Sequence, residues 1–315
     1  MHTVELEVLQ RATDWCRRGH RPWLCTIVKT IGSSPRPPGS MLVTLDGSEF
    51  AGTLSGGCVE DDLLQKLAAD SIDASLPTVV EYGVTAEENE RLGLPCGGRL
   101  LVLVQRLEEP DLPWLEQVLQ CLERRECLCR TLDLATGTTE LAPVEFHEPL
   151  EYREDRLKQC FGPQMRMLLV GAGQLSQTLS ELALAMGYEV LVTDPRQHTL
   201  DQWAGPEVPL IQGMPDEVVM EKAADRHSII ITLTHDPRID DMALMEALST
   251  EAWYVGALGS VRTTERRLAR LQELGVPEAD IARLHAPVGL SIGSKTPLEI
   301  AVAIMAQITQ LRRAR

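Results

Sequence analysis

The amino-acid sequence predicts an α/β protein of two domains, the second built on a doubly wound parallel sheet. A chain of 315 residues is long enough for two domains with a core each. Hydrophobic residues make up 44% of it and charged residues 24%, as is typical of soluble globular proteins. In the C-terminal half, apolar runs of strand length alternate with helical patterns, which favours a parallel sheet with helices on both faces.

The N-terminal domain is expected over residues 1–150, with helices and short strands mixed. Its first segment, about residues 4–18, has the apolar spacing of an amphipathic helix. The other elements expected here are strands within 23–33, 41–57, 77–84 and 98–107, helices over 59–70 and 112–125, and a hairpin over 127–146. The stretch "EYREDRLKQCFGPQ", residues 151–164, is polar, charged and interrupted by proline, so we expect a linker there.

The C-terminal domain is expected over residues 165–315. Its first segment, 165–196, has the pattern of strand, glycine turn, helix and strand. The elements that follow are strands within 227–236 and 252–260, and helices over 238–249, 261–275 and 296–315.

The glycine turn "VGAG" makes this second domain Rossmann-like. Gly171 and Gly173 follow an apolar strand and open a helix, and Asp194 ends the next strand. In this context a phosphate binds at the helix N-terminus and the acidic residue accepts from ribose hydroxyls. Ser176 stands where G-x-G-x-x-G has its third glycine, so a bound nucleotide and a turn kept for packing or dimerisation both remain open. His235 is the one candidate near a strand end for proton transfer in a hydride-transfer enzyme.

Charge and cysteine content exclude several classes of protein. The formal net charge of −16 argues against a general nucleic-acid surface. The N-terminus lacks a signal-peptide pattern, and no apolar run approaches the roughly 18 residues of a membrane span. The eight cysteines match neither a secreted disulfide framework nor paired C-x-x-C zinc ligands. We therefore expect a cytoplasmic protein with reduced thiols and no membrane partner.

Two cysteines stand beside glycines, in "LSGGCVED" and "GLPCGGR". Cys58 follows Gly56 and Gly57, and Cys96 precedes Gly97. We expect Cys58 in the first turn of a helix, where unpaired amides and the helix dipole favour a thiolate while nearby acidic residues oppose it. Glycines also leave the backbone open, so that an anion can reach those amides. Both thiols are candidate sulfur carriers or soft-metal ligands.

The remaining cysteines lie in apolar or helical contexts, where free cysteine is usually a packing residue. They are Cys16, Cys25, Cys121, Cys127, Cys129 and Cys160.

Two further loops combine a cation with small residues. Arg36 lies in "SSPRPPGS", a proline-stiffened loop that is either an oxyanion or phosphate clamp or an ordinary surface turn. Lys295 lies in "GLSIGSKTP", directly before a helix expected to start at Pro297. This second loop is either an anion site or only a capped helix.

Together these motifs resemble the XdhC/CoxI family, the maturation factors of xanthine dehydrogenase and related molybdenum hydroxylases. The matching motifs, in the family's order between about residues 22 and 310, are "IGSSPRPPGSMLV", "GTLSGGCVE", "LPCGGR", "VGAG", "YVGALGS" and "RLHAPVGLSIGSKTPLEIAVAI". The resemblance implies an N-terminal XdhC/CoxI-type domain followed by a Rossmann-like domain, and association as a homodimer.

The resemblance also implies a function, that of a chaperone without established turnover. Such a protein binds molybdenum cofactor, as molybdopterin or its cytosine dinucleotide. It protects the cofactor while a cysteine desulfurase supplies sulfur, and delivers it to an apo molybdenum hydroxylase. The family's cofactor-handling positions fall on Arg36, Cys58 and Cys96, with both thiols as expected contacts of the molybdenum–sulfur group. One departure is Gln174, where the family commonly has histidine, so proton transfer at that turn is not expected.

Two other functions compete with this one. The Gly171 turn and Asp194 would serve an NAD-dependent oxidoreductase. Cys58 and Cys96 would serve a thiol redox protein, provided that their Cα atoms lie within roughly 7 Å of each other.

Overall fold

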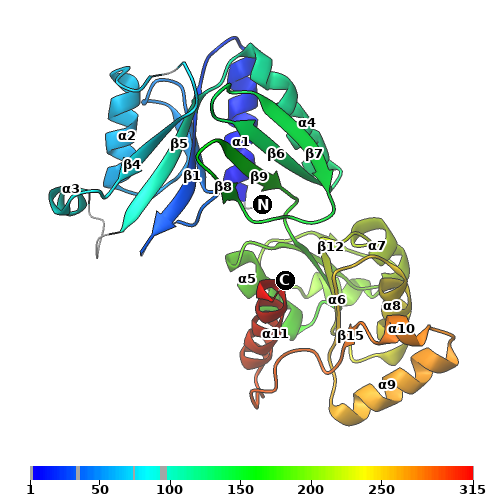
Figure 1. Ribbon diagram of the computed structural model, residues 1–315. Helices are drawn as coiled ribbons and strands as arrows, with labels where there is room; N and C mark the ends of the chain where they lie inside the picture. Colours follow the sequence, from blue (N-terminus) through cyan, green and yellow to red (C-terminus); the bar gives the residue numbers. More distant parts are fainter. Residues whose placement is uncertain (1–2, 33–35, 74, 93–97, 315) are drawn as a thin grey trace. The chain divides into compact units, whose positions relative to one another are not determined.

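The computed structural model describes residues 3–32, 36–73, 75–92 and 98–314. The chain divides into two compact units, Met1–Pro163 and Gln164–Arg315 (Figure 1). Each unit has its own sheets and its own core. No helix among the described residues is both long enough and apolar enough to cross a membrane.

The N-terminal unit is built on an antiparallel sheet of five strands in the order β3-β2-β1-β5-β4. These strands are β1 (Trp23–Ile31), β2 (Met41–Thr44), β3 (Phe50–Gly52), β4 (Thr78–Tyr82) and β5 (Arg99–Arg106). Side chains alternate between the two faces along each strand, so this sheet contributes to two cores. Leu24 packs on one face, and its neighbours Trp23 and Cys25 pack on the other.

Helices cover both faces of this sheet. The helices are α1 (Thr3–Arg17), α2 (Cys58–Ala68), α3 (Ala86–Arg91) and α4 (Leu112–Glu123), with a short 3₁₀ turn at Glu109–Asp111. Buried residues of α2 join the core on the Trp23 side, whereas α1 and α4 join the core on the Leu24 side. The sheet and its helices thus form the mixed α/β domain that the sequence predicts.

A second, four-stranded antiparallel sheet includes the segment that the sequence analysis assigns to a linker. Its strands are β6 (Cys127–Asp133), β7 (Thr139–Val144), β8 (Glu151–Tyr152) and β9 (Arg156–Phe161), in the order β7-β6-β9-β8. β9 pairs with β6 along its whole length. The linker expectation fails because Leu157, Cys160 and Phe161 are buried against the N-terminal unit, although charged residues surround them in the sequence.

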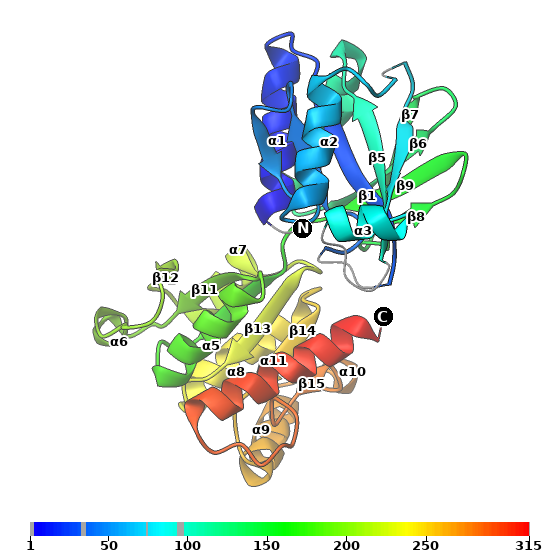
Figure 2. The ribbon, with the colours of Figure 1, turned by 90° about the vertical axis from the view of Figure 1, so that its left-hand side faces the viewer.

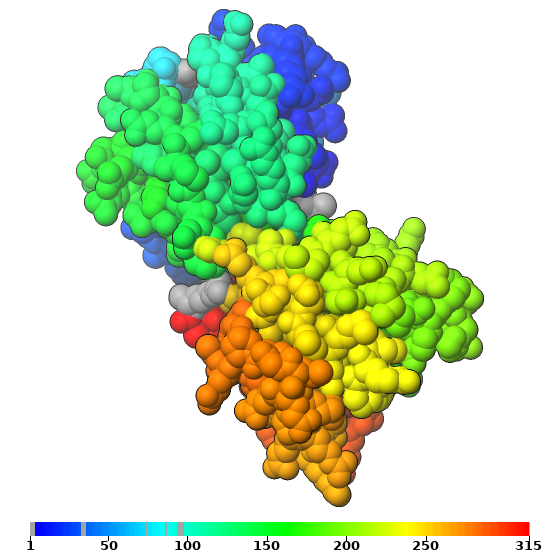
Figure 3. All heavy atoms as spheres, turned by 90° about the vertical axis from the view of Figure 1, so that its right-hand side faces the viewer, coloured from blue at the N-terminus to red at the C-terminus, as the bar shows by residue number. Residues whose placement is uncertain are grey.

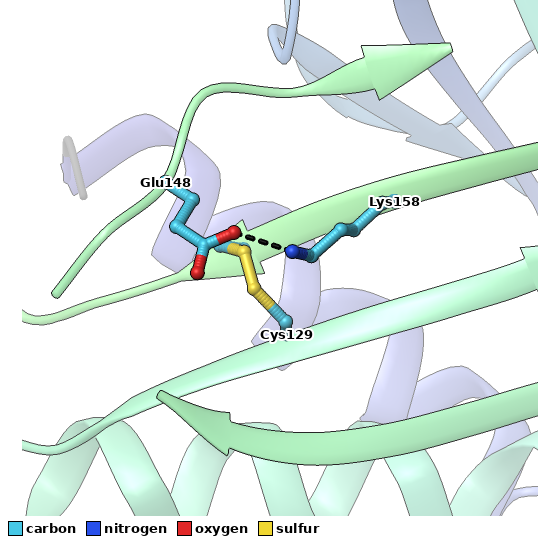
Figure 4. The surroundings of a disulfide bond; sticks show 4 residues. Cys129, Glu148 and Lys158 are labelled. Atoms are coloured by element: carbon cyan, nitrogen blue, oxygen red, sulfur yellow. Dashed lines mark hydrogen bonds and ion pairs between the residues drawn. A yellow bond between two sulfur atoms is a disulfide. The ribbon is translucent and has the colours of Figure 1, made fainter. Parts of the chain in front are cut away.

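The expectation that every thiol stays reduced also fails, because Cys129 and Cys160 form a disulfide (Figure 4). The two residues lie directly opposite each other on β6 and β9, with their Cα atoms 4.0 Å apart. Glu148 lies beside the disulfide and pairs with Lys158 (Figure 4). Among the described residues, this is the one group of side chains whose ligand atoms lie close enough together to hold a metal, and in the structure its two sulfur atoms are bonded to each other.

Reduction of this disulfide is expected to lower the free energy of unfolding of the N-terminal unit by about 2–4 kcal/mol. The bond joins residues 31 positions apart and so restricts the unfolded chain. Calorimetry with and without a dithiol reductant measures the change. A variant carrying Cys129→Ser and Cys160→Ser is the control and should not respond to the reductant; an equal response of both proteins would contradict the prediction.

The C-terminal unit contains a parallel sheet of six strands in the order β12-β11-β10-β13-β14-β15. The strands are β10 (Arg166–Val170), β11 (Glu189–Thr193), β12 (Leu210–Ile211), β13 (Ser228–Thr232), β14 (Tyr254–Ala257) and β15 (Leu284–His285). The chain moves outward from β10 in one direction and then restarts beside it at β13, which is the doubly wound Rossmann order. The predicted fold class is therefore confirmed.

Helices lie on both faces of the parallel sheet. They are α5 (Gln174–Ala185), α6 (Gln197–Asp201), α7 (Pro215–Lys222), α8 (Pro237–Ser249), α9 (Val261–Glu273), α10 (Glu278–Ile281) and α11 (Pro297–Arg313). Figure 2 shows α5 and α11 side by side on one face, where they bury Met167 and Leu169 of β10. α7 and α8 cover the other face and bury Leu168 and Val170. These four consecutive residues of β10 are all apolar because both faces of the sheet are covered.

Candidate functional site

One edge of the five-stranded sheet gathers the N-terminal segments that the sequence analysis selects. β1 ends at Ile31, which pairs with Arg99 at the start of β5, and β3 ends at Gly52, which pairs with Leu42 near the start of β2. Antiparallel neighbours reverse direction at each edge, so the loops at 32–40, 53–57 and 83–98 all leave the sheet on the same side. These loops carry Arg36, Cys58 and Cys96 respectively, or lead directly into them.

Glycine contacts pack two of these loops closely together. A Cβ atom on Gly32 would lie 3.4 Å from the Cα atom of Gly98, and one on Gly83 would lie 2.1 Å from the Gly98 carbonyl oxygen. Gly83 also has a φ of 85°, which side chains other than glycine rarely adopt. The segment that follows β1 and the segment that precedes β5 are thus neighbours. Cys96 and Gly97, the other predicted site residues of this segment, lie outside the described residues.

Cys58 is exposed and is the first residue of α2, as the sequence predicts. Gly57 is the residue before the helix, and its carbonyl oxygen accepts from the Glu60 amide at 2.9 Å. Gly56 has a φ of 74°, so the chain turns here in a conformation that favours glycine. The Cys58 thiol therefore stands at the end of a glycine turn, open to a ligand.

The amides of this turn are not open to an external anion, contrary to expectation. One carboxylate oxygen of Glu60 accepts from the hydroxyl of Thr53 and from the amides of Leu54, Ser55 and Gly56. Burial alone would raise the pKa of Glu60, but these hydrogen bonds outweigh burial and hold the pKa below its usual value. The chain thus supplies its own anion to the turn, and Gly56 serves the shape of the loop.

Arg36 is half-buried in the loop between β1 and β2. The end of this loop is fixed against β1, because the Gly39 amide donates to the Ile27 carbonyl at 2.8 Å and the Ile27 amide donates to the Ser40 carbonyl at 2.9 Å. The guanidinium and the Cys58 thiol therefore belong to loops on one edge of one sheet. A hard cation for phosphate and a soft sulfur donor for a metal or a sulfur atom are both available there.

The C-terminal unit has a cavity of about 730 Å³ at the carboxyl ends of β10, β13 and β14. It lies where the strand order reverses, between β10 and β13, which is the usual ligand position in a doubly wound sheet. Gly171, Gly173 and Lys295, three of the predicted site residues, line it together with Gln174 and His235. The glycine turn and the C-terminal loop, far apart in the sequence, thus meet at one site.

The turn itself requires glycine at its first position. Gly171 has a φ of 110°, and a Cβ atom there would lie 2.8 Å from Cγ2 of Thr234. Around Gly173, which precedes α5, no atom lies within 4 Å of the position of a Cβ atom. The first residue is needed for the fold of the turn, and the second leaves the N-terminus of α5 open toward the cavity.

Asp194 does not have the role that the sequence analysis gives it. Its side chain is 0% exposed. One carboxylate oxygen accepts from Nε and the amide of Arg196 at 2.8 and 3.0 Å; the other accepts from the Arg196 guanidinium and the Ala172 amide at 2.9 and 3.1 Å. Burial would raise the pKa of Asp194, but these bonds outweigh it and lower the pKa. A ribose diol would have to displace bonds that the carboxylate already makes.

Four arginines of this cavity were missed by the sequence analysis. They are Arg196, Arg266, Arg267 and Arg270. Three of them come from α9, whose sequence "VRTTERRLARLQE" indicates only an amphipathic helix. The signal was the run of basic residues on a helix that follows a strand end, but which of them face the cavity depends on how α9 packs.

Comparison with known proteins matches residues 15–83 to the XdhC and CoxI family and residues 167–308 to the XdhC Rossmann domain. A Bacillus subtilis protein, named as one of the probable subunits of xanthine dehydrogenase, is 27% identical, covering 92% of this chain and 93% of its own. The molybdenum cofactor insertion chaperone PaoD of Escherichia coli is 25% identical, covering 97% and 88%.

A crystal structure from Bacillus halodurans, described as a xanthine dehydrogenase, is 27% identical and superposes with a TM-score of 0.74, covering 100% of this chain and 97% of its own. The two matched regions fall one in each unit of the structure, in the order that the sequence motifs predict. The chain therefore belongs to the XdhC/CoxI family.

Proposed function

We propose that this protein is an accessory factor of molybdenum hydroxylases that binds molybdenum cofactor, protects it during sulfuration and delivers it to the apo enzyme. Its partners would be an apo hydroxylase of the xanthine dehydrogenase type and a cysteine desulfurase. The relatives named for molybdenum cofactor insertion and for xanthine dehydrogenase support this assignment. We further propose that the protein acts in the cytoplasm as a homodimer.

The observation that carries the proposal is the exposed Cys58 thiol on the sheet edge that also bears Arg36. A cofactor of this kind presents a soft molybdenum–sulfur group at one end and a phosphate at the other. A thiolate suits the first and a guanidinium suits the second. Cys25 and Cys127, by contrast, are buried, and burial raises the pKa of Cys25 to about 12 and of Cys127 to about 11. Among these three, Cys58 is the thiol that a ligand can reach.

The two competing functions have less support. An NAD-dependent oxidoreductase would use Asp194 to accept from the ribose, and this carboxylate is already bound by Arg196 and Ala172. A redox pair of Cys58 and Cys96 has no geometric support within the described residues. We therefore propose no oxidoreductase activity.

Replacement of Cys58 with alanine is expected to reduce the molybdenum and pterin that co-purify with the protein by roughly tenfold or more. Even residues that only support metal ligands commonly change metal affinity by about 10- to 100-fold, so loss of a direct sulfur contact should have at least this effect. The protein is purified from a cofactor-producing host supplied with molybdate, and both quantities are measured by elemental analysis and by fluorescence of the oxidised pterin.

Cys121→Ala is the matched control, because Cys121 is a half-exposed cysteine on α4, a helix that joins the opposite core from α2. This control should retain the cofactor of the unmodified protein and the same melting temperature. Equal cofactor content in the Cys58 variant and the control would refute the proposed role of Cys58. If the unmodified protein carried no pterin or molybdenum, the chaperone function itself would be refuted.

A further inference from the structure

The cavity of the C-terminal unit is strongly basic, although the protein as a whole has a net charge of −16. Five basic side chains line it: Arg196, Arg266, Arg267, Arg270 and Lys295. No aspartate or glutamate is among the described residues that line it. Because so acidic a protein repels anions at long range, a concentration of cations in one cavity indicates a local binding site for an anion.

Not all of these cations are available to a ligand. Arg196 pairs with Asp194, Arg267 with Asp240 at 3.1 Å, and Arg270 with Asp241 at 2.5 Å. These pairs hold the walls of the cavity together.

Arg266 and Lys295 remain. Their side chains are exposed, and no ion pair of either is found in the part of the chain that the structure describes. α9, which carries Arg266, lies at the surface of the C-terminal unit (Figure 3, orange). These two cations, from different elements, are therefore the ones free to bind an anion.

The N-terminus of α5 adds a second place for a negative group. Helices α8, α9 and α11 also begin at the cavity, but each has a side chain that caps its first turn: Asp236, Ser260 and Thr296 respectively. α5 begins after Gly173, which has no capping side chain. The first amides of a helix attract anions through hydrogen bonding and the helix dipole. An anion bound by Arg266 and Lys295 thus has an uncapped helix N-terminus in the same cavity.

We propose that this cavity binds a nucleotide through its pyrophosphate group, with one phosphate at the N-terminus of α5 and the charge of the group neutralised by Arg266 and Lys295. A cavity of about 730 Å³ lies within the usual range for such ligands. Recognition is by phosphate and not by the ribose diol, because Asp194 is fully buried and engaged by Arg196. The site differs in this respect from a dinucleotide site whose acidic residue reads the ribose hydroxyls.

Calorimetry of the full-length protein with four probes tests this proposal: inorganic pyrophosphate, ADP, 2′-deoxy-ADP and adenosine. Pyrophosphate and ADP should bind, adenosine should not, and 2′-deoxy-ADP should bind within about twofold of ADP because no carboxylate is free to read the 2′-hydroxyl. Absence of binding by both pyrophosphate and ADP would overturn the proposal. Much weaker binding of 2′-deoxy-ADP would overturn the claim that the diol is not read.

Variants of the two free cations provide the second test. Arg266→Ala combined with Lys295→Ala should weaken ADP binding by roughly 100-fold, since each charge-assisted contact commonly changes affinity by about tenfold or more. Arg262→Ala is the matched control, because Arg262 is exposed one turn earlier on α9 and does not line the cavity. Equal ADP affinity of the double variant and the unmodified protein would overturn the proposal. Cys58→Ala should leave ADP binding unchanged, so this test is independent of the proposed chaperone function.

Discussion

Replacing Arg267 with methionine is expected to destabilise the C-terminal unit by about 3–5 kcal/mol, because the change leaves a buried carboxylate without its cation. The side chains of Arg267 and Asp240 are 3% and 1% exposed, and they form an ion pair at 3.1 Å. Arg267 also donates to the Leu258 carbonyl at 3.0 Å and lies 3.7 Å from Asp241. Methionine fills much of the same volume, so the loss reports the charge more than a cavity.

The measurement is urea-induced unfolding, combined with hydrogen exchange of peptides from α8 and α9. The exchange data are needed because two units can unfold separately, which makes a single transition ambiguous. Arg262→Met, at an exposed position of the same helix, is the control and should change the free energy of unfolding by no more than about 0.5 kcal/mol. If both variants lose the same amount, the buried ion pair is not the cause.

The pH dependence of the Arg267 variant separates the charge effect from lost packing. Burial raises the pKa of Asp240, and the hydrogen bond from Thr234 and the charge of Arg267 oppose that rise. Without the arginine the pKa should rise further, so the folded protein retains the proton to higher pH than the unfolded chain does. A raised carboxyl pKa makes stability fall as the pH increases through the folded-state pKa. The variant's deficit should therefore be smaller near pH 4 than near pH 8; a deficit independent of pH would contradict this account.

Local patterns predicted the C-terminal sheet, whereas contacts between distant residues decided the details of its site. An apolar strand followed by Gly171 and Gly173 is a signal contained in one short segment, and the turn lies where the pattern predicts it. The partner of Asp194 was not visible in that pattern. Spacing locates a carboxylate at a strand end, but the choice between a ligand and Arg196 depends on side-chain packing.

The same limit explains the errors in the N-terminal unit. β9 was hidden because charged residues interrupt its apolar positions, Leu157 and Phe161, and its burial becomes clear only once β6 lies beside it. The disulfide of Cys129 and Cys160 depends on the register between those strands, which no local spacing reveals.

Replacing Glu60 with alanine should alter the Cys58 loop and lower the free energy of unfolding of the N-terminal unit by about 2–4 kcal/mol. Glu60 is half-buried and accepts from the Thr53 hydroxyl at 2.5 Å, from the Ser55 amide at 2.9 Å and from the amides of Leu54 and Gly56. Alanine leaves these donors without their acceptor, and the loop loses the group around which it is folded. Cys58, two residues before Glu60, should then react with a thiol reagent at a changed rate.

Asp61→Ala is the control, because Asp61 is exposed in the same first turn of α2 and accepts no such set of bonds. Glu60→Gln should lose less than Glu60→Ala, since the amide oxygen remains an acceptor without charge. Because the folded-state pKa of Glu60 lies below its usual value of about 4.5, the stability that its charge contributes is complete above that pH and is lost as the pH falls through the folded-state pKa. The difference between the protein and its Glu60→Gln variant should accordingly shrink in acid, and a difference that stayed constant down to pH ~3 would mean that the ionised carboxylate does not hold the loop.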